Sequence, residues 1–298
     1  MAAIKAAQNG LKTAVVEKAE LGGVCLNWGC IPTKALLKSA QVYNYAKHAA
    51  GYGIEINGEI TAPLDKIVER SRGVADTMSK GVSFLMKKNG IEVINGRGRL
   101  GGKGTVEVEG TDGTKQTVEA SHIILATGSR PREMKFMPID GRKIISSKEA
   151  LVLRELPESM AVVGSGAIGC EFAYFYASLG VKVTIIEYLP QLIPAADTDV
   201  SKALERAFRK MKIVSIYQSS LPSVTGSSSF CSSPTFGTMF CTSLFCFLAS
   251  AAFLAFLLSL RRTTNTSTPS TSSNGITNHK NTKPTVCTSL PPFCCPNG

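Results

Sequence analysis

Residues 159–187 constrain the fold of this chain more than any other segment. A short apolar run, Ser159–Val163, leads into the glycine-rich hexapeptide 164–169 and then into a helical pattern that ends near Leu179. A second run, Lys182–Glu187, follows and ends in an acid. This order predicts strand, tight turn, helix and strand, which is one complete βαβ unit. Because βαβ units place their strands parallel, the segment predicts a doubly wound α/β sheet.

The glycine pattern of this unit also predicts a dinucleotide site. Glycines permit the tight turn and let the backbone approach a pyrophosphate, whose charge then lies at the helix N-terminus. Glu187 would accept a hydrogen bond from an adenosine ribose hydroxyl and would disfavour a 2′-phosphate, so NAD is expected rather than NADP. A glycine-rich turn without a ligand is the alternative. The predicted NAD-binding residues are Gly164, Ser165, Gly166, Ala167, Ile168, Gly169 and Glu187.

Hydrophobic periodicity and turn residues predict the remaining elements. Helices are expected over 2–8, 25–50, 65–89 and from 199 to 212. Strands are expected over 12–17, 91–95, 104–109, 116–120 and 122–126, the last of them buried. Strands that alternate with helices again favour a parallel sheet.

The strongest chemical signal is the sequence GGVCLNWGCIPTK at residues 22–34. Cys25 and Cys30 lie five residues apart at the predicted start of a helix. The helix dipole and the free N–H groups at a helix N-terminus favour a thiolate, which makes a redox-active pair. Two buried structural cysteines are the alternative. With Cys170, these are the only cysteines before residue 214, a usage typical of a reducing compartment.

This segment resembles the active-site segment of the flavin-dependent pyridine nucleotide-disulfide oxidoreductases, class I. Within the family it is closest to the dihydrolipoamide dehydrogenases, and the resemblance covers about residues 1–213. It implies that Cys25 exchanges with the substrate and that Cys30 faces the flavin. It further implies that Lys34 lies near the reactive flavin nitrogen and that Glu171 pairs with this lysine near the nicotinamide.

The same resemblance implies FAD as a second cofactor. Glu17, at the end of KTAVVE, matches the acid that binds the adenosine ribose of FAD. The family's first strand and its Gly-x-Gly-x-x-Gly loop should precede Glu17 by some twenty residues, and they have no match here. The residues that the resemblance assigns to FAD are Glu17, Gly22, Gly23, Lys34, Gly98, Thr127, Gly128 and Ser129.

The implied reaction carries electrons from dihydrolipoamide through the Cys25–Cys30 disulfide and FAD to NAD⁺. The implied partner is the dihydrolipoyl domain of 2-oxo-acid dehydrogenase complexes. The family is homodimeric, but its interface domain, with the acid–base histidine, has no match in this chain. The expected compartment is the cytoplasm or the mitochondrial matrix.

Composition divides the chain. The net charge is +11, yet residues 214–298 contain no Asp or Glu and hold six of the nine cysteines. This change in composition marks residues 214–298 as an aberrant tail, and the family resemblance implies an FAD-binding domain over 1–146 without its first strand and a partial NAD-binding domain over 147–213. An apolar run at 236–260 precedes Arg261-Arg262, and the Ser/Thr/Asn/Pro-rich residues 263–298 are expected to be disordered.

Two origins of the tail stay open. Its Ser, Phe, Leu and Pro residues have pyrimidine-rich codons, so translated non-coding sequence would give this composition. We expect the chain to be inactive as it stands, because the family's acid–base histidine and first strand have no match in it. A membrane anchor at 236–260 is the rival, in a membrane-tethered redox or scaffold protein. A glutathione-reductase-like activity is a further alternative, although Glu187 disfavours NADPH. Basic residues without interleaved aromatics argue against nucleic-acid binding, and no cysteine spacing indicates a metal.

Overall fold

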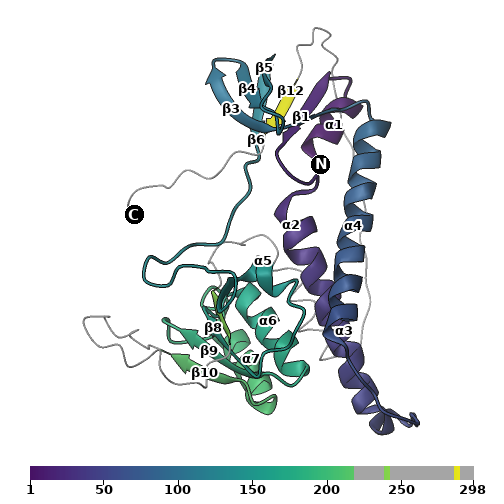
Figure 1. The fold of residues 1–298 in the computed structure, drawn as a ribbon, viewed down its shortest axis with the longest axis vertical. Coiled ribbons are helices and arrows are strands. Elements are labelled where there is room, and N and C mark those ends of the chain that lie inside the picture. The colour runs from purple at the N-terminus through teal and green to yellow at the C-terminus, as the bar shows by residue number, and fades with distance from the viewer. Residues whose placement is uncertain (218–237, 242–284, 289–298) are drawn as a thin grey trace. The chain divides into compact units, whose positions relative to one another are not determined.

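The computed structural model describes residues 1–217, 238–241 and 285–288, and it divides into two compact units. Unit 1 contains Met1–Leu21, Ser79–Ser129 and the strand β12. Unit 2 contains Gly22–Met78, residues 130–217 and the strand β11. Figure 1 shows the elements of both units.

The helices of the described residues are α1 (Ala2–Gln8), α2 (Gly23–Trp28), α3 (Cys30–Lys47), α4 (Leu64–Lys88), α5 (Ser147–Ala150), α6 (Ala167–Ser178) and α7 (Thr198–Lys210), with a 3₁₀ turn at Ala49–Tyr52. The strands are β1 (Thr13–Glu17), β2 (Glu92–Asn95), β3 (Arg97–Gly102), β4 (Thr105–Glu109), β5 (Lys115–Glu119), β6 (His122–Leu125), β7 (Ile144–Ser146), β8 (Ser159–Val163), β9 (Lys182–Glu187), β10 (Val214–Tyr217), β11 (Thr238–Cys241) and β12 (Thr285–Thr288).

Unit 1 is built on β1, whose alternating side chains pack on two different layers. Ala14 and Val16 join a buried cluster with Val106 and Val108 of the antiparallel sheet β3-β4-β5. Val15 packs instead against the cluster that contains residues of α1 and of the end of α4. Because strand side chains alternate between faces, one short strand supports both layers of the core.

The parallel sheet of unit 1 has the order β2-β1-β12-β6. Strand β12 pairs with β1 on one side, Thr13 opposite Thr285, and with β6 on the other. It lies within the stretch expected to be disordered, and that expectation does not hold for these four residues. The strand satisfies backbone groups at the edge of β1 that would otherwise lack a partner.

Unit 2 is built on a five-stranded parallel sheet with the order β10-β9-β8-β11-β7. Helix α6 connects β8 to β9 and is strongly apolar, so its large side chains Phe172, Phe175 and Tyr176 are buried. The Tyr176 hydroxyl donates to the carbonyl of Ala150, which ties α6 to the end of α5. Strands β8 and β9, which α6 connects, pair in parallel, and this confirms the predicted βαβ unit and parallel sheet.

Several elements were not predicted, among them β7, α5 and β10, and three further differences have a clear physical reason. The helix expected over 25–50 is two helices, because the chain breaks at Gly29. The strand at 122–126 is not buried: three of the four β6 residues are exposed. Strand β3 was not predicted, since its glycines at 98, 101 and 102 resemble a loop; pairing with β4 forms it.

The apolar run at 236–260, for which a membrane anchor was the rival interpretation, lies outside the described residues except for strand β11, Thr238–Cys241. Of the helices in the part of the chain that the structure describes, none has the length and apolar character needed to cross a bilayer.

Candidate active site

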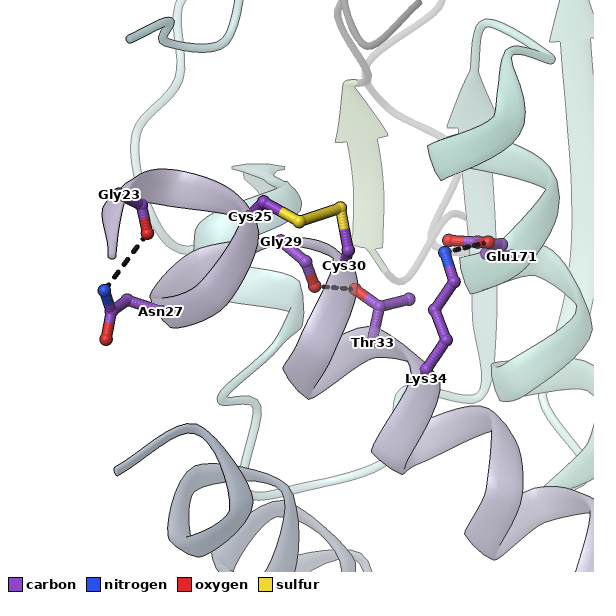
Figure 2. Close-up of a disulfide and its surroundings, with 8 residues drawn as sticks. All are labelled: Gly23, Cys25, Asn27, Gly29, Cys30, Thr33, Lys34 and Glu171. Atoms are coloured by element: carbon purple, nitrogen blue, oxygen red, sulfur yellow. Dashed lines mark hydrogen bonds and ion pairs between the residues drawn. A yellow bond between two sulfur atoms is a disulfide. The ribbon is translucent and has the colours of Figure 1, made fainter. Parts of the chain in front are cut away.

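The Cys25–Cys30 pair lies where α2 meets α3, and the two cysteines form a disulfide (Figure 2). Their Cα atoms are 4.7 Å apart, within the range that a disulfide needs. Cys25 is exposed, whereas Cys30, the first residue of the 18-residue helix α3, is half-buried. An attacking thiolate therefore reaches Cys25 first.

The break at Gly29 brings the two cysteines together. A Cβ atom at Gly29 would lie 3.0 Å from the Val24 carbonyl oxygen and 3.1 Å from the Cys25 Cα, so a larger residue would displace backbone. The carbonyl of Gly29 accepts from both the N–H and the hydroxyl of Thr33, at 3.0 and 2.7 Å. Gly29 thus allows α2 and α3 to meet so that Cys25 and Cys30 can form the disulfide.

At the other end of α2, the chain enters the helix through two left-handed glycines. Gly22 and Gly23 have φ angles of 101° and 71°, a region that other residues rarely adopt. The carbonyl of Gly23 accepts from the amide of the buried Asn27 at 3.1 Å. The two glycines therefore set the direction from which α2 presents Cys25.

Lys34 and Glu171 form an ion pair next to this disulfide, as Figure 2 shows. The Lys34 Nζ donates to Glu171 Oε1 at 2.6 Å, the pairing that the resemblance implies. Glu171 is 5% exposed and lies on α6, whereas Lys34 lies on α3 and is 36% exposed. Burial raises the pKa of Glu171, and the Lys34 ammonium opposes part of that rise. The pair fixes the lysine within unit 2.

The glycine-rich loop 164–169 connects β8 to α6, as predicted. Gly164 has a φ of 95° and its N–H donates to the Ile186 carbonyl at 2.8 Å. Ser165 is fully buried, and both its N–H and its hydroxyl donate to Glu187 Oε2 at 2.7 Å. Glu187 Oε1 accepts from the Leu189 N–H at 2.9 Å. Glu187, which is expected to bind a ribose, thus also stabilises the glycine-rich loop through Ser165.

The third cysteine of the first 213 residues, Cys170, is buried and forms no disulfide. Burial, with the nearby carboxylates of Glu171 and Glu187, raises the pKa of the Cys170 thiol far above its usual value. The thiol donates to the Ser165 carbonyl at 3.2 Å. Cys170 therefore remains a neutral thiol that supports the loop. Among the described residues, no cluster of His, Cys, Asp and Glu has the arrangement of a metal site.

The residues assigned to FAD are divided between the units. Glu17 ends β1 in unit 1 and accepts from the Ala19 N–H at 3.0 Å. Gly98 is a buried residue of β3, opposite Val108. Thr127, Gly128 and Ser129 follow β6 without regular structure, with Gly128 at a φ of 72°. Unit 2 holds Gly22, Gly23 and Lys34.

A sequence profile described as pyridine nucleotide-disulphide oxidoreductase matches residues 1–237. The chain belongs to this family. It is 51% identical over 212 residues to a dihydrolipoyl dehydrogenase of Chlorobaculum parvum, which covers 71% of this chain and 45% of the relative. It is 46% identical over 225 residues to the dihydrolipoyl dehydrogenase of Zymomonas mobilis, covering 76% and 48%. The chain thus spans about half the length of the curated relatives it matches.

Solved structures support the same fold. LpdA from Mycobacterium tuberculosis aligns with a TM-score of 0.66 at 24% identity, over 72% of this chain and 47% of that one. The flavoprotein disulfide reductase RclA from Escherichia coli aligns with a TM-score of 0.61 at 26% identity, over 72% and 46%. The family match extends past residue 213, where the resemblance was expected to end, and the first residues beyond that point form β10, which continues the parallel sheet.

Proposed function

We propose that this chain carries the disulfide centre and the NAD site of a dihydrolipoyl dehydrogenase. The observation that carries the proposal is the exposed Cys25 disulfide-bonded to the half-buried Cys30, with the Lys34–Glu171 pair one turn further along α3. The similarity to curated dihydrolipoyl dehydrogenases supports the substrate, a dihydrolipoyl dithiol.

The exchange proceeds in two steps that balance. A substrate thiolate attacks Cys25 Sγ, forms a mixed disulfide, and releases Cys30 as a thiolate. The second substrate thiolate then attacks the substrate sulfur of the mixed disulfide and releases Cys25. The products are a lipoyl disulfide and the Cys25/Cys30 dithiol, so two electrons have passed to the protein. The N-terminus of α3 stabilises the Cys30 thiolate.

The geometry of the glycine-rich loop fits NAD. The left-handed Gly164 turns the chain into the N-terminus of the 12-residue helix α6, where N–H groups meet a pyrophosphate. Each carboxylate oxygen has two lone pairs, so Glu187 Oε1 retains capacity for a ribose hydroxyl beside its bond to Leu189. When bound, NAD⁺ would supply a hydride acceptor.

FAD fits the chain only in part. Glu17 stands at the carboxyl end of β1, where an adenosine ribose would bind. Strands β2 and β12 lie on either side of β1. The glycines after β2 enter strand β3 and not a helix, and no glycine-rich hexapeptide follows β12 in the sequence. We therefore propose FAD as the cofactor of the full reaction but derive no step through it from these residues.

The same similarity supports further proposals about the setting. The proposed partner is the dihydrolipoyl domain of a 2-oxo-acid dehydrogenase complex, and the proposed assembly is a homodimer. The cytoplasm and the mitochondrial matrix are the proposed compartments. Each follows from resemblance alone and is secondary to the disulfide chemistry.

Two serine variants test the order of attack. In Cys30→Ser, Cys25 has lost its partner and should react with glutathione disulfide, which gives a mixed disulfide of Cys25 with one glutathione and releases the other. In Cys25→Ser, the half-buried Cys30 should react more slowly. Mass mapping of the peptide that contains both positions separates this reaction from those of the other cysteines. Equal rates in the two variants would contradict the proposed role of Cys25.

The substrate is tested with the unaltered chain. Dihydrolipoamide and reduced glutathione are compared as reductants of the Cys25–Cys30 disulfide, with free thiols counted after an acid quench. A rate for dihydrolipoamide no greater than for glutathione at equal thiolate concentration would contradict the substrate assignment.

A further inference from the structure

The side chain of Trp28, which lies between the two cysteines in sequence, is contacted by two cations from other elements. The guanidinium of Arg72, on α4, lies 4.2 Å from the centroid of the Trp28 ring. The Nζ of Lys148, on α5, lies 4.6 Å from the same centroid. Both distances are well within the range of a cation–π attraction, and tryptophan is the ring that favours it most.

Arg72 makes a second contact with the same turn. Its Nη1 donates to the carbonyl of Asn27 at 2.6 Å. That carbonyl is among the last of α2, where carbonyl groups have no partner within the helix. One arginine thus holds two consecutive residues, the backbone of Asn27 and the ring of Trp28. Its guanidinium is planar, permanently charged and suited to both contacts at once.

The contacts of Asn27 and Trp28 lie at the end of α2, directly before the break that separates the two cysteines. Gly29 follows Trp28 directly and is the single residue that joins α2 to α3. While the disulfide is intact, it links the two helices covalently. Once the disulfide is reduced, that link is gone. The contacts of Asn27 and Trp28 then hold the end of α2 next to Cys30.

We propose that Arg72, Trp28 and Lys148 form a clamp that keeps Cys25 within reach of Cys30 in the dithiol state. The clamp contains positioning residues, and it rests on the proposed function of the Cys25–Cys30 pair. Its effect is to raise the effective concentration of one thiol toward the other, which favours the disulfide. The sequence offers no local sign of it, since Arg72 and Lys148 lie 44 and 120 residues from Trp28.

The equilibrium with glutathione measures this effect directly. The full chain is equilibrated with defined ratios of reduced and oxidised glutathione, quenched with acid and alkylated. In the overall reaction, two protein thiols and one glutathione disulfide give one protein disulfide and two glutathione thiols. Peptide mass mapping then gives the oxidised fraction of the Cys25–Cys30 pair, without any cofactor.

Arg72→Ala should lower the equilibrium constant for disulfide formation by about tenfold, as expected for the loss of one charged hydrogen bond and one cation–π contact. Trp28→Ala should act similarly, and Trp28→Phe should restore part of the loss because it keeps an aromatic face. The matched control is Arg70→Ala. Arg70 also lies on α4 and donates to a carbonyl at 2.9 Å, but to Ala35 within α3.

Trp28 is the single tryptophan of the chain, so its fluorescence reports on the clamp. In Arg72→Ala and Lys148→Ala the emission maximum of the reduced chain should shift to longer wavelength as the ring gains water, whereas Arg70→Ala should leave it unchanged. A merely structural role of Arg72 would affect stability without this coupling to the redox equilibrium.

Two outcomes would overturn the proposal. One is an equilibrium constant for Arg72→Ala within about twofold of that for Arg70→Ala. The other, should Arg72→Ala not fold, is an unchanged equilibrium constant in both Lys148→Ala and Trp28→Phe. A chain that does not prefer dihydrolipoamide would contradict the proposed substrate, yet it would leave this comparison of variants intact.

Discussion

Glu187 accepts hydrogen bonds from both the backbone N–H and the hydroxyl of Ser165, so the acid at the end of β9 braces the glycine-rich loop that follows β8. Both residues are buried, at 5% and 0% exposure. The loop is therefore organised by the protein itself before a dinucleotide arrives. Such preorganisation lowers the entropy lost when a ligand binds.

Glu187→Ala should destabilise the protein by about 2–4 kcal/mol, because it leaves two buried donors of Ser165 without a partner. The free energy of unfolding from urea titration measures this, and NADH binding should weaken in parallel. The control is Glu205→Ala, which removes an exposed ion pair with Arg209 one helical turn away and should change stability by less than about 1 kcal/mol. Equal losses in the two variants would refute the bracing role.

Gly29→Ala should destabilise the chain by about 1–3 kcal/mol, since the new Cβ must displace the backbone of α2. It should also lower the fraction of Cys25–Cys30 disulfide at a given glutathione ratio. Gly73→Ala in α4 is the matched control, because a Cβ there meets nothing within 4 Å. Replacing a helical glycine at such a site should stabilise by about 0.5–1 kcal/mol. A stabilising Gly29→Ala would contradict the account of the α2–α3 break.

Glu171 gives the stability of the protein a defined pH dependence. Its pKa in the folded state is raised above the ordinary 4.5, chiefly by burial. As the pH rises past 4.5, Glu171 loses its proton in the unfolded chain before it does so in the folded protein. The stability that protonated Glu171 contributes therefore declines, until the pH passes the pKa of Glu171 in the folded state. Glu171→Gln should remove this decline. Urea titrations at pH values from 4 to about 8 measure it.

Glu149→Gln is the control of opposite sign for that experiment. Burial raises the pKa of Glu149, but hydrogen bonds from the Ser146 hydroxyl and backbone N–H outweigh it, and the net pKa is lowered. The stability that Glu149 contributes is present above its ordinary pKa and is lost as the pH falls through the folded value. A Glu149→Gln profile identical to that of Glu171→Gln would contradict both assignments.

The 298-residue chain should bind NADH but retain FAD weakly or not at all. The NAD loop is complete, whereas among the described residues the sheet that contains β1 and Glu17 has no Gly-x-Gly-x-x-Gly loop that opens a helix and could bind the FAD pyrophosphate. Absorbance of the purified chain after gel filtration with added FAD measures flavin retention, and NADH fluorescence is the positive control. A tightly bound yellow chromophore would refute the prediction.

The glycine pattern shows how context decides the meaning of a motif. Gly-x-Gly-x-x-Gly occurs at 164–169 and again at 96–101. The first stands between β8 and α6, and Gly164 adopts a left-handed turn. The second enters β3, where it pairs with β4 and forms an antiparallel hairpin. A helix must follow the glycines before their N–H groups can face a phosphate.

Burial was predicted less well than secondary structure. The apolar sequence of 122–125 indicated a buried strand, but β6 stands at the edge of its sheet with Ile124 and Leu125 exposed. Apolar composition reports what a strand can bury, whereas its place in the sheet order decides what covers it. The helix break at Gly29 was missed because a lone glycine within a helical pattern is usually tolerated.

The sequence by itself determined the elements with strong local signals: the βαβ unit at 159–187, the long helix expected over 65–89 and observed as α4, and the spacing that allows Cys25 and Cys30 to form a disulfide. These depend on periodicity, turn residues and neighbours within a few positions, which are local properties of the chain. The family resemblance added the expectation that Lys34 pairs with Glu171.

Only the tertiary structure decided how distant residues complete the site. It brings Lys34 within 2.6 Å of Glu171, 137 residues away, and it places Arg72 and Lys148 over Trp28. It also inserts β12 between β1 and β6. No local pattern encodes these contacts, because they exist only once the helices and sheets have packed and brought the side chains within reach.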